Sequence, residues 1–393
     1  MFKNLARASV SVFLNTRLPA VMLALAAFTS QAQTATSALA VAVAVAPEAS
    51  IRPPIQSPLK IAFVYVSPIG EAGWTFQHEQ GRLAMQQALG DRVVSTVVEA
   101  VAEGADSERV MRDLAAQGHT LIFATSFGYL EPALRVAAAY PDVRIEHAGG
   151  YKTAANLGTY NARYYEARYL AGMLAGKASR SGLAGYVAGF PVPEVVQGIN
   201  AFTLGMREVN PQAQVRVLWL NTWFDPARER EAAQSLINQG ADVLTNHSGS
   251  PAVPQTAQAN FKDKGVRAIA YQSDMRQFAP DAQLAAVTHH WGGYYTQVAN
   301  AVLNGTWKPQ PAWGGMKDGL VQLSAVNGDV PAPVQALVEA RRKAIVAGSF
   351  KPFTGPLTDN EGRVRLAQGA LDDASIATMN WFVRGVVGSV PKP

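Results

Sequence analysis

From residue 58 onward, short apolar runs alternate with longer amphipathic segments. Leu59 to Val66 has the length of a strand and is rich in β-branched and aromatic residues. A helical pattern follows it to about Leu89, and further strands are expected at 92–98, 120–124 and 143–147. Strands that alternate with helices are typical of βαβ units and a parallel sheet. This part of the chain predicts one doubly wound lobe.

The same series begins again near residue 182. Strands are expected at 182–188, 214–220 and 242–245, with helical patterns between them, and a further strand is expected at 283–288. The segment Leu114 to Gly118, LAAQG, resembles LINQG at 236–240, and each precedes a strand. We therefore expect an α/β protein with two doubly wound lobes built on one plan.

Parallel sheets of this kind bind ligands beyond the carboxyl ends of their strands. Two facing lobes place both sets of loops on one cleft, where helix N-termini offer free N–H groups. The candidate binding residues in these loops are Gly73, Trp74, Thr75, Ser126, Phe127 and Gly128 in the first lobe, and Phe190, Trp223, Asn246 and Ser248 in the second. Several aromatic residues in such loops favour stacking on a flat solute. The alternative is that each aromatic side chain packs against its own lobe.

The N-terminus predicts export to the periplasm. Lys3, Arg7 and Arg17 precede an apolar run at 18–28, which the small residues of Ser30-Gln31-Ala32 follow. This order is typical of a secretory signal peptide, predicted at 1–32, and the run is too short to span a bilayer. Cleavage at Ala40 or Ala46 is an alternative. Residues 33–57 are expected to form a disordered leader.

Composition narrows the chemistry further. The chain has no cysteine, which excludes a disulfide, a thiolate metal site, a cysteine nucleophile and a lipid anchor on cysteine. Of the formal charge of +5, three positive charges fall in the predicted signal peptide, so no nucleic-acid partner is expected. The sequence contains none of the motifs H-E-x-x-H, G-x-S-x-G or the phosphate loop. We therefore expect that the protein is not an enzyme and that it binds neither a metal nor a cofactor. His147 ends a strand and is interpreted as a polar group at the sheet edge rather than a ligand contact.

An ordered set of short motifs resembles the basic membrane protein (BMP) family of ABC-transporter substrate-binding proteins. The motifs run from Lys60-Ile61-Ala62-Phe63-Val64 and Glu71-Ala72-Gly73-Trp74-Thr75 through Ala124-Thr125-Ser126-Phe127-Gly128, Gly172-Met173-Leu174-Ala175-Gly176 and Gln239-Gly240-Ala241-Asp242-Val243 to Tyr271-Gln272-Ser273-Asp274-Met275. The resemblance implies a type I periplasmic-binding fold and a purine ligand delivered to an ABC permease in the inner membrane. We expect the protein to act as a monomer.

The resemblance also implies that the chain crosses between the lobes three times. We expect crossings near 161–165, 274–280 and 308–316. The first lobe would then comprise 58–162 and 276–310, and the second 163–275 and 311–388. Lys317 is expected to approach the cleft at the last crossing.

Departures from the family's nucleoside-binding pattern indicate a smaller ligand. Trp74 stands where nucleoside binders carry phenylalanine, and Trp291 lies near the position of their lysine. Asp274 matches an aspartate that holds ribose hydroxyls, but a carboxylate can equally accept from a purine N–H group. We therefore expect a free purine base, adenine-like. The alternatives are a purine nucleoside ligand, a ligand-sensing role beside a membrane receptor, and a nucleoside hydrolase.

Overall fold

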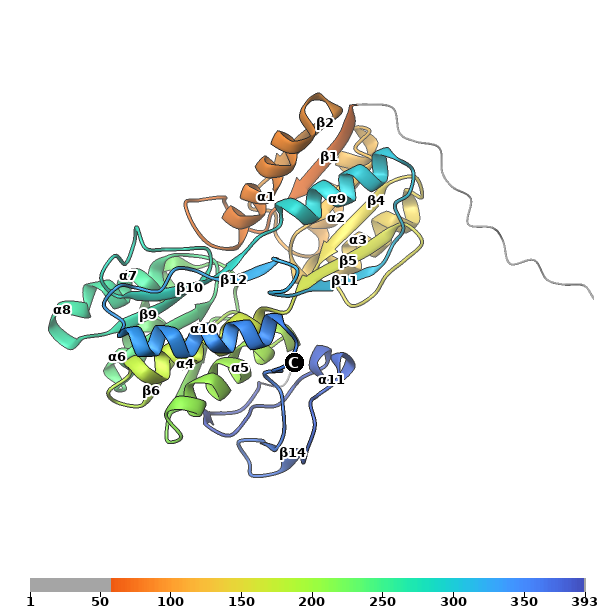
Figure 1. Ribbon diagram of the computed structural model, residues 1–393. Helices are drawn as coiled ribbons and strands as arrows, with labels where there is room; N and C mark the ends of the chain where they lie inside the picture. Colours follow the sequence, from red (N-terminus) through yellow and green to blue (C-terminus); the bar gives the residue numbers. More distant parts are fainter. Residues whose placement is uncertain (1–57, 392–393) are drawn as a thin grey trace, which may run out of the picture. The chain divides into compact units, whose positions relative to one another are not determined.

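The computed structural model describes residues 58–391, which fall within one compact unit, Ile51–Pro393. The predicted signal peptide and leader, 1–57, lie outside the described residues. Two parallel sheets flanked by helices confirm the α/β prediction (Figure 1). No helix among residues 58–391 combines the length and the apolar character that crossing a bilayer requires.

The first sheet has six strands, and every neighbouring pair in it is parallel. Its order is β11 (Pro311–Gly314), β5 (Leu157–Ala162), β4 (Arg144–Ala148), β3 (Leu121–Ala124), β1 (Leu59–Val64) and β2 (Val93–Val98). The helices of this lobe are α1 (Trp74–Leu89), α2 (Ala105–Ala116), α3 (Leu130–Ala139) and α9 (Gly292–Leu303), with short 3-10 turns η1 (Gly90–Arg92) and η2 (Phe127–Tyr129).

Alternate side chains of β1 reach opposite faces of this sheet. Ile61 and Phe63 share a core with Tyr295 of α9, whereas Ala62 and Val64 belong to a second core with α2 and α3. Helices on both faces explain why the strands are almost continuously apolar. Although far apart in sequence, α1 and α9 pack side by side (Figure 1).

The second sheet has seven strands. Its order is β12 (Val321–Leu323), β10 (Gln283–His289), β9 (Arg267–Gln272), β8 (Val243–His247), β6 (Leu183–Ala188), β7 (Gln214–Trp219) and β15 (Val386–Val387). Only β12 is antiparallel to its neighbour within this described sheet. The helices of this lobe are α4 (Tyr164–Ala178), α5 (Pro193–Val209), α6 (Pro226–Asn238), α7 (Ala252–Ala259), α8 (Phe261–Lys264), α10 (Ala332–Val346) and α11 (Asp373–Ala377).

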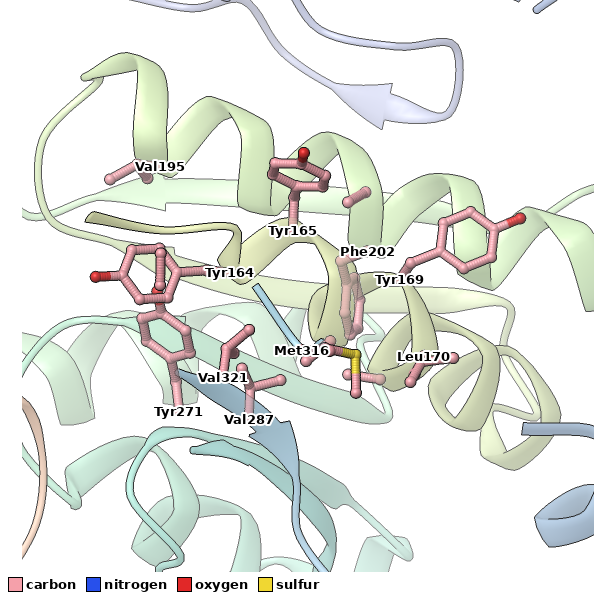
Figure 2. Packing of buried hydrophobic residues seen from close by; sticks show 14 of the residues in the cluster. Tyr164, Tyr165, Tyr169, Leu170, Val195, Phe202, Tyr271, Val287, Met316 and Val321 are labelled. Atoms are coloured by element: carbon pink, nitrogen blue, oxygen red, sulfur yellow. The ribbon is translucent and has the colours of Figure 1, made fainter. Parts of the chain in front are cut away.

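One face of the second sheet packs on α4 and α5, and the other packs on α6 and α7. Figure 2 shows the first of these cores, in which Tyr164 of α4 lies beside Tyr271 of β9, with their ring centroids 6.2 Å apart. A small hairpin, β13 (Leu357–Thr358) with β14 (Val364–Leu366), lies in the C-terminal segment. That segment is fixed to α5, since Asn200 bonds the backbone of both Trp381 and Val383.

The chain crosses between the sheets at Arg163, between β10 and α9, and between β11 and β12. The predicted crossing at 274–280 is wrong, because β10 pairs with β9 in the second sheet and all seven of its residues are buried there. Residues 276–289 therefore belong to the second lobe, and β11, which was assigned to the second lobe, joins the first sheet beside β5. An apolar run in the sequence predicts that a buried strand forms there, but it does not indicate which of the two sheets the strand joins.

Candidate functional site

A cavity lies between the carboxyl ends of the two sheets. It encloses about 500 Å³ of space that protein atoms do not fill, part of it open to solvent. Its lining comes from both lobes: Val66, Ser67, Trp74, Ser126, Phe127, Ala148 and Gly149 from the first, and Glu194, Trp223, Phe224, His247, Gly249 and Gln272 from the second.

Aromatic side chains from both lobes form much of the cavity lining. Trp74 opens α1, and its Nε1 donates to the carbonyl oxygen of Thr125 at 2.7 Å, which ties the ring to the end of β3. Trp223 follows β7 and packs edge-on against Phe190, with ring centroids 4.8 Å apart. Each lobe thus presents one tryptophan side chain to the cavity.

The polar lining residues of the second lobe lie at strand ends and a helix start. Glu194 is in the first turn of α5, where the helix dipole favours a carboxylate. Its Oε2 accepts from Asn161 of the first lobe at 3.1 Å, and its Oε1 lies 3.4 Å from Nε2 of His247. Burial lowers the pKa of His247, so the imidazole is neutral at pH 7. The site therefore offers one carboxylate beside a neutral histidine.

Gln272 ends β9 with a φ of 71°, a conformation that residues other than glycine seldom adopt. Its Oε1 is buried and has no hydrogen-bond partner within the described residues. A strained backbone and an unpaired buried amide oxygen at a cavity both indicate a functional position.

Arg168 supports this wall from behind. It is fully buried, donates to Oγ1 of Thr245 at 2.9 Å and to the carbonyl oxygen of Asn246 at 2.6 Å, and its guanidinium lies 3.5 Å from the ring centre of Tyr271. No carboxylate within residues 58–391 pairs with it in a salt bridge. Because Tyr271 packs on His247, the cation fixes the strand ends that carry the lining residues.

Of the candidates predicted from sequence, four line the cavity: Trp74, Ser126, Phe127 and Trp223. Six lie next to it without lining it, namely Gly73, Thr75, Gly128, Phe190, Asn246 and Ser248. Thr75 is buried and bonds Ser67, and Asn246 donates to the carbonyl oxygen of Ser248. These neighbours shape the binding loops through their own hydrogen bonds.

Three predicted residues lie elsewhere. Asp274 is exposed, and its carboxylate accepts from Nε2 of Gln283 at 2.6 Å and from the backbone of Arg276. Lys317 is also exposed and does not line the cavity. Trp291 is buried and borders a separate hollow beside α1 and α9. Asp274 and Trp291 were predicted from the family pattern and Lys317 from the expected crossing, and none of the three lines the cavity.

Sequence reasoning did not identify Glu194 and Gln272 as candidate binding residues, whereas His247 lies between the predicted residues Asn246 and Ser248. His247 and Gln272 are the last residues of β8 and β9, and that position was the available signal, because the carboxyl ends of parallel strands border the cleft. No group of three or more histidines and carboxylates in the described part of the chain could hold a metal ion.

Known proteins resemble the chain over most of its length. A purine-binding protein of Brucella abortus is 49% identical over 85% of this chain and 94% of its own length. A putative ABC transporter glucose-binding protein of Haloferax volcanii is 38% identical over 84% of this chain and 81% of its own.

The fold has solved counterparts as well. A solute-binding protein of an ABC transporter system from Aeropyrum pernix superposes with a TM-score of 0.65 at 17% identity, over 75% of this chain and 93% of its own. The model of the Bmp family, described as PnrA-like ABC transporter substrate-binding proteins, matches residues 59–348. The chain therefore belongs to the Bmp family of ABC transporter substrate-binding proteins.

Proposed function

We propose that this protein binds a purine base, adenine-like, between its two lobes and delivers it to an ABC permease. The observation that carries the proposal is the cavity lined by Trp74 and Trp223 from opposite lobes, with few polar groups between them. A purine is flat and has a π-face that aromatic rings stack on, and each stacked base contributes about 1–3 kcal/mol. The purine-binding relative in Brucella supports the same class of ligand.

The polar groups suit the edges of adenine. Gln272 carries one acceptor and one donor group, the pair with which glutamine reads the amino group and N7 of adenine. Glu194 accepts only, when ionised, and would bind a ring or amino N–H. Together they provide acceptors for the N–H groups and a donor for a ring nitrogen.

The charges in the cavity disfavour a nucleotide. None of the described lining residues is lysine or arginine, and the one charged side chain among them is the carboxylate of Glu194. A phosphate group would be repelled by Glu194 and would lack a cation to bind. A neutral base or nucleoside has no such penalty, so a purine nucleoside remains the second candidate.

Binding between two lobes couples ligand capture to closure. Only a closed form contacts the ligand from both sides, so the ligand shifts the population toward that form. A permease that recognises the closed form would then accept loaded protein in preference to empty protein. The proposal includes export by the predicted signal peptide, a periplasmic location and a monomeric protein.

Uptake of labelled adenine tests delivery. Cells that lack this gene should take up adenine more slowly at low external concentration, and the gene with Trp223→Ala should not restore uptake. Normal uptake in the deletion strain would contradict delivery by this protein. Incubation of the purified protein with adenosine should release no ribose, and release of ribose would favour the hydrolase alternative.

A further inference from the structure

Glu103 does not line the cavity, yet its carboxylate reaches the binding loops of both lobes. It lies in the loop between β2 and α2. Its Oε1 accepts from Oγ of Ser126 at 2.6 Å and from the backbone N–H of Gly128 at 2.8 Å, both in the first lobe. The same oxygen accepts from Nε1 of Trp223, in the second lobe, at 3.1 Å.

The close approach of this carboxylate depends on a glycine. A Cβ atom at position 128 would overlap the carboxyl group of Glu103. Gly128 therefore allows Glu103 to sit against the start of η2 and to point its oxygen toward the opposite lobe.

The bond to Trp223 uses the only hydrogen-bond donor of the indole ring. Within the second lobe, Phe190 packs edge-on against the same ring. The acceptor is a carboxylate on an exposed residue, and at 3.1 Å this bond is longer than the two that Glu103 accepts within its own lobe. The Nε1 end of the ring is thus bonded to the other lobe.

We propose that Glu103 is a positioning residue that holds the Trp223 ring against the ligand once the lobes close. This inference rests on one part of the proposed function, namely that a ligand binds in the cavity. Because the bond joins the lobes, it forms on closure and breaks on opening. Its loss should therefore speed ligand release and leave association nearly unchanged.

A double-mutant cycle measures this coupling. Glu103→Ala should raise the dissociation rate of adenine about tenfold, which is the order expected for a bond to a charged group. Trp223→Phe keeps an aromatic ring without the donor, and in that background Glu103→Ala should change the rate less than twofold. An equal effect of Glu103→Ala in both backgrounds would overturn the proposal, because Glu103 would then act only through Ser126 and Gly128.

Glu131→Gln is the matched control, since Glu131 bonds Lys152 within the same lobe. It should leave the release rate unchanged. Glu103→Gln keeps the shape and one acceptor oxygen, and should give an intermediate rate.

A second readout does not depend on the identity of the ligand. The indole N–H signal of Trp223, assigned in nuclear magnetic resonance spectra by its loss in Trp223→Phe, should shift in Glu103→Gln. An unchanged signal, both with and without added purine, would overturn the proposal. If adenosine binds and adenine does not, the proposed ligand is wrong, and the indole signal measured with adenosine decides the role of Glu103.

Discussion

A Cβ atom on Gly73 would overlap the carbonyl oxygen of Gly249, a residue of the opposite lobe. Beside this contact, the backbone N–H of Gly73 donates to Oγ of Ser273 at 2.8 Å. The two lobes thus meet backbone to backbone next to the cavity, at a residue with a φ of 95°. Gly73 was predicted as a ligand contact, and in the structure it contacts the opposite lobe beside the cavity.

Gly73→Ala should therefore weaken adenine binding at least tenfold, because the methyl group holds the lobes apart. Gly70→Ala is the matched control, since Gly70 also has a positive φ, 58°, but has open space around it. Backbone strain is greater at Gly73, whose φ of 95° and ψ of −160° fall in a region almost confined to glycine, so the loss of compaction is the measurement that identifies the closure contact. Calorimetry and small-angle scattering should show lost affinity and lost compaction for Gly73→Ala alone. If the two substitutions weaken binding equally, the contact of Gly73 with the opposite lobe does not contribute to closure.

Trp74→Ala should cost about 1–3 kcal/mol of binding free energy if the ring stacks on a base. Trp74→Phe should cost less, because it keeps a ring and loses only the hydrogen bond to Thr125. Calorimetry on both variants measures the difference, and circular dichroism checks that they fold. Unchanged affinity of Trp74→Ala would mean that the ring serves only to pack on His78, whose ring centroid lies 4.4 Å away.

Glu194→Gln should weaken adenine binding about tenfold, because a ligand N–H would lose a charged acceptor and keep a neutral one. Asn161 should still find an acceptor in the glutamine side chain, so the first lobe should remain correctly placed. Glu231→Gln is the control, since Glu231 is exposed on α6 of the same lobe and does not line the cavity. If the two variants bind adenine equally well, the carboxylate of Glu194 does not contact the ligand.

Glu146 should make the protein less stable as the pH rises. Burial raises the pKa of this carboxyl group to about 7, although bonds from Tyr294 and Trp307 favour its ionised form. Between pH 4.5 and 7 the folded state then binds more protons than the unfolded state, so the free energy of unfolding falls as the pH rises. The loss should be on the order of 3 kcal/mol.

Glu146→Gln isolates this effect. Urea unfolding at pH 5 to 8 should show the wild type losing stability relative to the variant as the pH increases. Burial lowers the pKa values of His78 and His147 to about 3, which destabilises both proteins below about pH 6.5 and cancels in the difference. A difference that does not vary with pH would show that Glu146 titrates normally.

Much of the fold was predictable because strands buried on both faces produce distinct apolar runs. Leu59–Val64 and Gln283–His289 were both recognised as strands in this way. The lobe to which the second of them belongs was not predictable. That choice depends on pairing with β9 across the sheet, and no local sequence signal encodes it.

The sequence predicted those lining residues whose position depends only on the order of strands and helices along the chain. Trp74 and Trp223 follow strands at the edge where the lobes meet, and both line the cavity. Asp274 follows a strand as well, but its side chain is held by Gln283, a contact that forms only in the folded chain. Gln272 was missed because it reads as the end of a buried strand, although its place at the carboxyl end of a parallel strand was a signal that it borders the cleft.

The central claim is that a purine base binds between the lobes. Isothermal titration calorimetry with adenine, hypoxanthine, adenosine, guanosine, adenosine monophosphate and glucose tests it most directly. Adenine should bind at one site per chain and more tightly than adenosine, and neither the monophosphate nor glucose should give a binding signal. Tighter binding of adenosine than of adenine would contradict the assignment of a free base, and binding of glucose without adenine would contradict a purine ligand.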